Sequence, residues 1–130
     1  MLLELLKLLF DPGTLLGLWF LSLLFTWVVE IPVFVQLVRG TVPWPRAAIA
    51  GAAGTLLTHP LLWFVWPRIV GPDYTVYVGS GELTVGVVES LTFFALARPV
   101  SFWRAVSTSF LANAASYGLG VLVLHPLLGY

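Results

Sequence analysis

Charged residues and cysteine are the scarcest features of this 130-residue chain. Charged residues make up 9% of the sequence, whereas a soluble domain carries about 25%. Because so few charges cannot cover a surface that faces water, most of the surface is expected to face lipid. The sequence contains no cysteine, which excludes disulfides, thiolate nucleophiles and cysteine-bound metals.

Catalytic and nucleotide-binding motifs are also missing. The chain has no GxSxG, no P-loop and no dinucleotide fingerprint, and it has none of the HExxH, ExxH or HxxxH spacings of metal ligands. Six basic residues balance six acidic ones, so charge gives no reason to expect a nucleic-acid partner. We therefore expect no enzymatic activity, no cofactor and no bound metal. An intramembrane metalloenzyme with Glu30, Glu89 and His59 as ligands is the least favoured alternative.

Apolar runs are what the sequence has in abundance. Hydrophobic residues make up 59% of the chain, and the mean hydropathy is +0.99. A helix needs about 20 mostly apolar residues to cross the hydrocarbon layer of a bilayer. Four runs approach or exceed that length: 14–38, 45–66, 82–97 and 102–124. We predict an all-α integral membrane protein, a four-transmembrane-helix bundle that forms a single transmembrane domain over residues 1–130.

The segments outside these runs carry their own signals. Residues 1–10 read MLLELLKLLF and lack the basic start and small-residue cleavage site of a signal peptide, so they predict a short N-terminal interfacial helix. Asp11 is the expected N-cap of the next helix, with Pro12 at its first position. Within the loop 70–81, the alternation of polar and apolar residues over 74–78 predicts an extended piece at the interface.

The sequence also repeats itself. At an offset of 59 residues, VVEIPVFVQLVR aligns with VVESLTFFALAR, so Glu30 matches Glu89 and Arg39 matches Arg98. At an offset of 58, the next helices align in the same way. The matched pairs there are Arg46 and Arg104, Thr55 and Asn113, Thr58 and Ser116, and His59 and Tyr117. The pattern predicts two parallel helical-hairpin repeats, repeat A at about 14–66 and repeat B at about 82–124. Such repeats are common in transporters, but they also arise by duplication of a purely structural hairpin.

Arginines indicate the orientation in the membrane. Arg39 and Arg46 flank the first short loop, and Arg98 and Arg104 flank the second, with no acidic residue in either loop. The positive-inside rule places both loops in the cytoplasm and both termini on the outer side. We expect a multi-pass protein of the cell (inner) membrane.

Counting from the arginines places the polar residues at one depth. Glu30 and Glu89 lie nine residues before Arg39 and Arg98, and Thr55 and Asn113 lie nine residues after the arginines that begin the next helices. At about 1.5 Å per residue, this layer lies roughly 13 Å from the cytoplasmic edge. The candidate ion, proton or substrate-binding residues are Glu30, Thr55, Thr58, His59, Glu89, Asn113, Ser116 and Tyr117.

Two interpretations of this layer remain open at the sequence level. A carboxylate at such depth costs about 3 kcal/mol on insertion scales, and intramembrane acids commonly mark proton or ion sites. Alternatively, each acid keeps its proton and hydrogen-bonds Thr55 or Asn113, holding a hairpin together. His59 could relay protons, or it could be a neutral side chain bonded to Glu30 or to a carbonyl freed by Pro60.

These interpretations lead to two functional hypotheses. The first is a transporter of protons, ions or small solutes that works in the bilayer as a homo-oligomer, with the two glutamates as coupling acids. A water-filled cavity that reaches those acids would favour it. The second is a non-catalytic accessory or assembly subunit of a larger membrane complex. A dry and fully hydrogen-bonded polar layer would favour the second.

Overall fold

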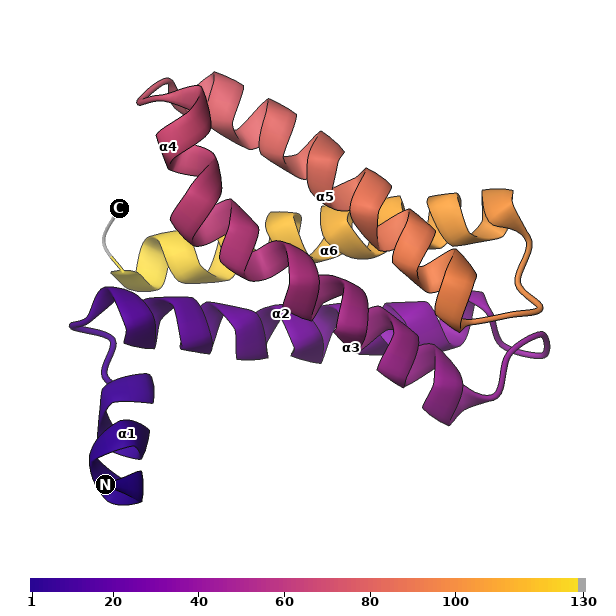
Figure 1. Cartoon of the computed structure of the whole chain (residues 1–130), viewed down its shortest axis with the longest axis horizontal. Coiled ribbons are helices and arrows are strands. Elements are labelled where there is room, and N and C mark those ends of the chain that lie inside the picture. Colours follow the sequence, from indigo (N-terminus) through magenta and orange to yellow (C-terminus); the bar gives the residue numbers. More distant parts are fainter. Residues whose placement is uncertain (129–130) are drawn as a thin grey trace.

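The computed structural model describes residues 1–128, and the regular elements in that part of the chain are all helical. The long helices of this part of the chain run along the molecule, and a short helix at the N-terminus projects from its end (Figure 1). The elements are α1 (Leu2–Leu9), α2 (Leu15–Leu37), α3 (Trp44–Pro60), the π-helix η1 (Leu61–Val65), α4 (Trp66–Val70), α5 (Tyr74–Leu96) and α6 (Phe102–Leu128). Helix α2 packs against α3 and α6, and α5 packs against the same two helices.

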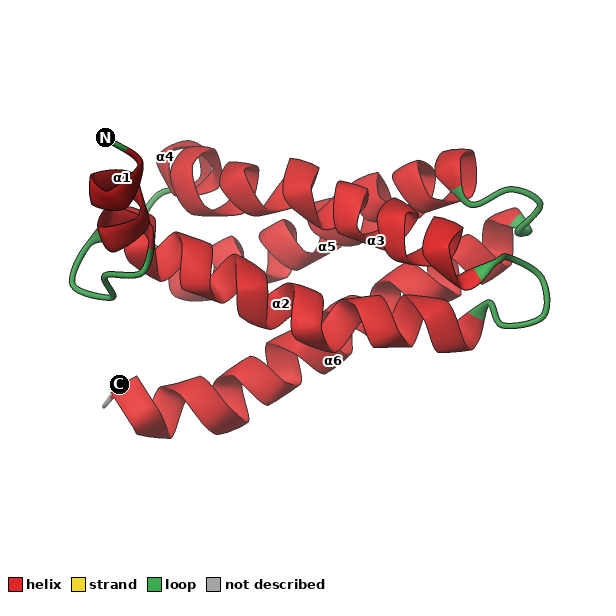
Figure 2. Cartoon of the chain, turned by 90° about the horizontal axis from the view of Figure 1, so that it is seen from below, coloured by secondary structure: helices red, strands yellow, loops and turns green. Residues whose placement is uncertain are grey.

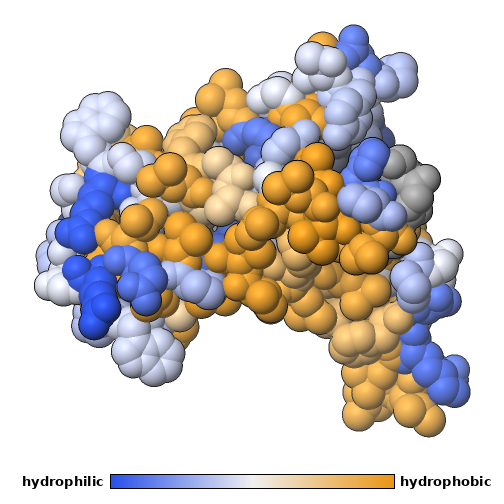
Figure 3. Space-filling view, turned by 180° about the vertical axis from the view of Figure 1, so that it is seen from behind, coloured by the Kyte–Doolittle hydropathy of each residue, from blue (hydrophilic) through white to orange (hydrophobic). Residues whose placement is uncertain are grey.

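Within residues 1–128, three helical segments are long and apolar enough to cross a membrane. They are α2, the continuous stretch Trp44–Val70 and α6 up to Leu127. Helix α5 has 23 residues but is not among them. Large apolar side chains are exposed on these helices, and an apolar band covers the middle of the face in Figure 3, with hydrophilic residues gathered toward the ends. Such a surface belongs in lipid, so the chain is a membrane protein.

The extended piece predicted over 74–78 is wrong, because α5 already begins at Tyr74. Asp73 caps this helix, and its Oδ1 accepts a hydrogen bond from the backbone N–H of Val76 at 3.0 Å. Tyr77 donates its hydroxyl hydrogen to the carbonyl of Leu62 at 2.9 Å. A helix satisfies its own backbone groups without a partner strand, and these two anchors fix its first turns beside η1.

The second predicted segment ends too early. Five π-helical residues follow directly after Pro60, and the chain then remains helical from Trp66 to Val70. Proline has no backbone N–H to donate and disturbs the regular hydrogen-bond ladder, which accounts for the change of helix type at this point. Gly71, with φ of 78°, ends the segment. The last helix likewise extends beyond the predicted end at 124, to Leu128.

The N-cap of α2 also differs from the prediction. Thr14 is the cap, and its Oγ1 accepts the backbone N–H of Gly17 at 2.9 Å. Asp11 instead accepts the N–H of Gly13 at 2.8 Å and forms the turn before the helix. Pro12 therefore lies in that turn and not in the first turn of α2. The predicted helix at the N-terminus is present as α1, in which no residue is buried.

An apolar core closes the end of the molecule where the two short loops lie. The rings of Phe34 and Phe93 are fully buried, with centroids 4.7 Å apart. Val38, Val42, Ala47, Ala50, Ala97, Val100, Ala105 and Ala112 complete this core. At the opposite end, the C-terminal half of α6 diverges from α2 (Figure 2). The bundle is therefore tight at the loop end and open toward the termini.

Arginines join the two halves of the chain at the loop end. Arg46, at the start of α3, donates to the carbonyl of Arg98 at 3.0 Å. Arg104, at the start of α6, donates to the carbonyl of Leu37 at 2.9 and 2.7 Å and to Thr41 at 2.6 Å. Each arginine thus donates to a backbone carbonyl at the C-terminal end of a helix of the other half, which reinforces the closed end.

Candidate functional site

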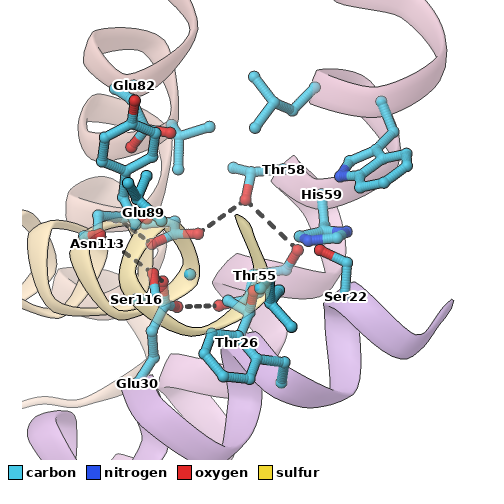
Figure 4. Close-up of a pocket in the computed structure, with 18 of the residues that line it drawn as sticks. Ser22, Thr26, Glu30, Thr55, Thr58, His59, Glu82, Glu89, Asn113 and Ser116 are labelled. Carbon is cyan, nitrogen blue, oxygen red and sulfur yellow. Dashed lines mark hydrogen bonds between the residues drawn. The ribbon is translucent and has the colours of Figure 1, made fainter. Parts of the chain in front are cut away.

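The polar centre is a hydrogen-bonded layer in the middle of the bundle. Glu30 of α2 is 1% exposed. Its Oε2 accepts the hydroxyl hydrogen of Thr55 at 2.8 Å, and its Oε1 accepts that of Ser116 at 2.6 Å (Figure 4). The first donor lies on α3 and the second on α6, so one carboxyl group joins three helices.

Glu89 of α5 is held in the same manner. It is also 1% exposed, its Oε1 accepts from Thr58 at 2.7 Å, and its Oε2 accepts from the side-chain amide of Asn113 at 2.6 Å. Gly54 lets α5 approach closely here, because a Cβ at that position would lie 3.3 Å from the Cγ of Glu89. All four carboxyl oxygens therefore accept a hydrogen bond, and every donor is an uncharged side chain.

Six of the eight candidate residues meet in this layer. The hydrogen bonds from Thr55 to Glu30 and from Asn113 to Glu89, which the sequence placed within each hairpin, are present. Two further hydrogen bonds, which the sequence does not predict, link the two halves of the chain. Ser116 donates to Glu30, and Thr58 donates to Glu89. The spacing in the sequence predicts how deep these hydroxyls lie in the bundle. It does not predict how one helix pair is rotated against the other, and that rotation determines which acid each hydroxyl meets.

His59 lies beside the layer and takes no part in its hydrogen bonds. The side chain is 7% exposed, and its Nδ1 is buried without a hydrogen-bond partner within residues 1–128. The expectation that it bonds Glu30 or a carbonyl freed by Pro60 is therefore wrong. The ring instead stacks on Trp63, with centroids 6.0 Å apart and planes at 24°, and it also faces Trp19 at 6.3 Å. Contacts with two indoles fix its orientation.

A cavity of about 630 Å³ reaches the polar layer. Glu30, Glu89 and His59 line it, and so do Tyr74 and His125 from the region of the termini. Tyr117, the last of the candidate residues, is 41% exposed and lines the wall of this cavity. The cavity thus runs from the open end of the bundle to the two acids. Beyond the acids lies the apolar core around the paired phenylalanines.

Several lining residues are not among the predicted candidates, although their spacing in the sequence offers a signal. Ser22 and Thr26 precede Glu30 by eight and four residues and line the cavity from the same face of α2. Glu82 lies seven residues before Glu89, two turns away on α5, and also lines the cavity. The predicted loop over 70–81 includes Tyr74, so the sequence does not place its side chain on the cavity face of α5.

The lining has a definite electrostatic character. It contains three carboxyl groups and no lysine or arginine among the described residues. No group of three His, Asp or Glu side chains in residues 1–128 lies close enough to hold a metal ion. The acids therefore present oxygen acceptors to the cavity without a counter-charge from the protein, an arrangement that favours positively charged contents.

Comparisons with protein-family models, with curated proteins and with solved structures found no match to the chain.

Proposed function

We propose that this protein is a small membrane transporter in which Glu30 and Glu89 exchange protons for a cation or small solute. The cavity of about 630 Å³ that ends on these two acids carries the proposal. Acids buried within a bundle are costly in a bilayer and usually serve a proton or ion pathway. A cavity that leads to them supplies the access that such a pathway needs.

The proposed topology has four spans, with α5 as the third. Two parallel hairpins, α2–α3 and α5–α6, would be related by a pseudo-twofold axis along the membrane normal. The hydrogen bonds support this relation: each glutamate receives one donor from the helix after it and one from the other hairpin. The two phenylalanines that pack against each other in the core, Phe34 and Phe93, also occupy equivalent positions in the two hairpins. With the arginine-flanked loops in the cytoplasm, the cavity would open to the outer side.

The chemistry of the layer suggests how exchange would work. Burial penalises the charge of a carboxylate and so favours the protonated form, while the hydrogen bonds that the two acids accept offset part of that penalty. A cation that enters the cavity stabilises the carboxylate, so its arrival and the departure of a proton are linked. The apolar core blocks the way to the loops, so release on the other side requires the hairpins to rock against each other. A homo-oligomer would provide a fixed frame for that motion.

A second candidate is an accessory or assembly subunit of a larger membrane complex. It is favoured by the complete hydrogen bonding of both glutamates, each only 1% exposed. In that role the protonated acids would serve only to hold the four helices together, and the cavity would be filled by a partner or by lipid.

Infrared spectroscopy of the reconstituted protein separates these candidates. The carboxyl stretch would be followed over about pH 4 to 10, the range of strongly perturbed acids. Glu30→Gln and Glu89→Gln would assign the bands, and Glu4→Gln, on the exposed α1, is the control. Transport predicts bands that titrate in this range and shift promptly in heavy water. Bands that stay protonated and resist exchange would reject transport in favour of the subunit.

A further inference from the structure

We propose that the cavity binds an organic ammonium ion, an amine with an aromatic or aliphatic body, as the substrate of the site. This inference rests on the proposed transport function and specifies the chemical class of its cargo. It draws on four features of the cavity: its charge, its aromatic wall, the unpaired nitrogen of His59 and its size.

Charge selects a cation. The lining holds the carboxyl groups of Glu30, Glu82 and Glu89, with no lysine or arginine among the residues described. Glu82 lies two turns from Glu89 on α5, about 10 Å along the helix axis, so acids occur both at the inner end and farther out in the cavity. Each of these carboxyl groups that gives up its proton adds negative potential within low-dielectric walls, which attracts positive ligands and disfavours anions.

The aromatic wall distinguishes an organic cation from a metal ion. Phe25, Trp63, Tyr74 and Tyr117 line the cavity, and aromatic faces attract ammonium groups through their quadrupoles. A metal ion would instead need several oxygen or nitrogen ligands at one point, and residues 1–128 hold no such group of three His, Asp or Glu side chains. The remaining lining includes Leu62, Val85, Val121 and Leu124, which suit an apolar body attached to the charged group.

His59 supplies an independent sign of a ligand. Its side chain is more than nine-tenths buried, lines the cavity, and has an Nδ1 without a hydrogen-bond partner in the described chain. In Figure 4 the ring points toward Ser22 and away from the bonded glutamates. An unpaired buried nitrogen is unfavourable. A neutral imidazole nitrogen can accept a hydrogen bond from an N–H donor. Neighbouring side chains cover Nδ1, so an ammonium ion that donates to it must displace them as it binds.

The size of the cavity agrees with a small organic molecule. A volume of about 630 Å³ falls within the roughly 300–1,000 Å³ range of small-molecule pockets. An inorganic cation would leave most of this space to water, against a wall that is largely apolar. An amine with an aromatic or aliphatic body fills the space and places its charge near the acids.

The test is calorimetric titration of the full chain in phosphatidylcholine nanodiscs, with empty nanodiscs as the blank. The probes are phenethylammonium, the uncharged 2-phenylethanol and the anionic 3-phenylpropionate. We expect saturable binding of phenethylammonium and affinity at least about tenfold weaker for the alcohol, which corresponds to the loss of one charge-assisted hydrogen bond. The anion should not bind.

Variants connect the binding to the named residues. Glu82→Gln leaves the bonded layer intact and should weaken phenethylammonium binding about tenfold, and so should His59→Phe, which keeps a stacking ring but removes the nitrogens. Glu4→Gln, outside the cavity, should bind as the parent chain does. Equal affinity for the amine and the alcohol, or unchanged binding in both cavity variants, would overturn the inference. If no amine binds but the glutamate bands still exchange promptly in heavy water, transport stands and only the substrate class falls.

Discussion

Replacing Gly51 with alanine should destabilise the bundle through a collision that can be located. A Cβ on Gly51 would lie 2.5 Å from Cδ2 and 2.8 Å from Cγ of Phe34, whereas non-bonded carbons prefer about 3.5 to 4.0 Å. Phe34 is fully buried and packs against Phe93 with ring centroids 4.7 Å apart. Because Cγ is the root of the ring, a simple swing of the side chain cannot relieve the contact.

The magnitude follows from two opposing terms. Overpacking of a well-filled core costs about 1 to 3 kcal/mol, while alanine gains up to about 1 kcal/mol over glycine inside a helix. Gly118→Ala on α6 isolates the second term, since nothing lies within 4 Å of its Cβ position. Gly51→Ala should therefore be less stable than Gly118→Ala by about 1 to 3 kcal/mol.

The assay is reversible unfolding in mixed micelles of a mild detergent and dodecyl sulfate, followed by circular dichroism. Phe34→Ala removes the ring together with its Cγ, so Gly51→Ala should cost less stability in the Phe34→Ala background than in the parent chain. Equal stability of Gly51→Ala and Gly118→Ala would refute the packing described for the closed end of the bundle.

Three further substitutions test other parts of the structure. Thr14→Ala removes the side-chain cap of α2 and should lower stability by about 1 kcal/mol, with faster hydrogen exchange confined to the first turn of that helix. Thr55→Val removes one donor from a buried carboxyl group and should cost about 0.6 to 1.7 kcal/mol in micelle unfolding, while Ser107→Ala, whose hydroxyl bonds only within its own exposed turn, should cost close to nothing. Arg104→Ala breaks charge-assisted bonds to the carbonyl of Leu37 at the end of α2 and should raise hydrogen exchange around the first short loop, an effect that Arg68→Ala at the other end should not reproduce.

Helix spans were predictable from the sequence because they depend on local hydropathy. The structure confirms the first helix closely, with α2 at Leu15–Leu37 against a predicted 14–38. It also confirms a helix at the N-terminus, α1. The predicted helix boundaries are wrong where a proline, a capping side chain or a contact distant in sequence determines where the helix begins or ends. The start of α5 depends on the cap at Asp73 and on the bond from Tyr77 to Leu62, and a short window of alternating residues contains neither.

The polar layer was predictable in depth but not in pairing. A rise of about 1.5 Å per residue places Glu30 and Thr55 at one level whatever their neighbours are, and the two are indeed hydrogen-bonded. Which hydroxyl reaches which acid across the bundle depends on how far each helix is rotated. The bond from Ser116 to Glu30 spans the two halves of the chain, and no spacing in the sequence encodes it.

Composition and helical rise are properties of each segment alone, so they are enough to predict the surrounding medium, the helical class and the level at which polar groups gather. The tertiary structure decided that the bundle is closed around Phe34 and Phe93 and open toward the termini. It also decided that a cavity reaches the acids and that His59 stands there without a hydrogen-bond partner in residues 1–128. Crossing angles and helix rotations produce these features, and they arise only when all four long helices pack together.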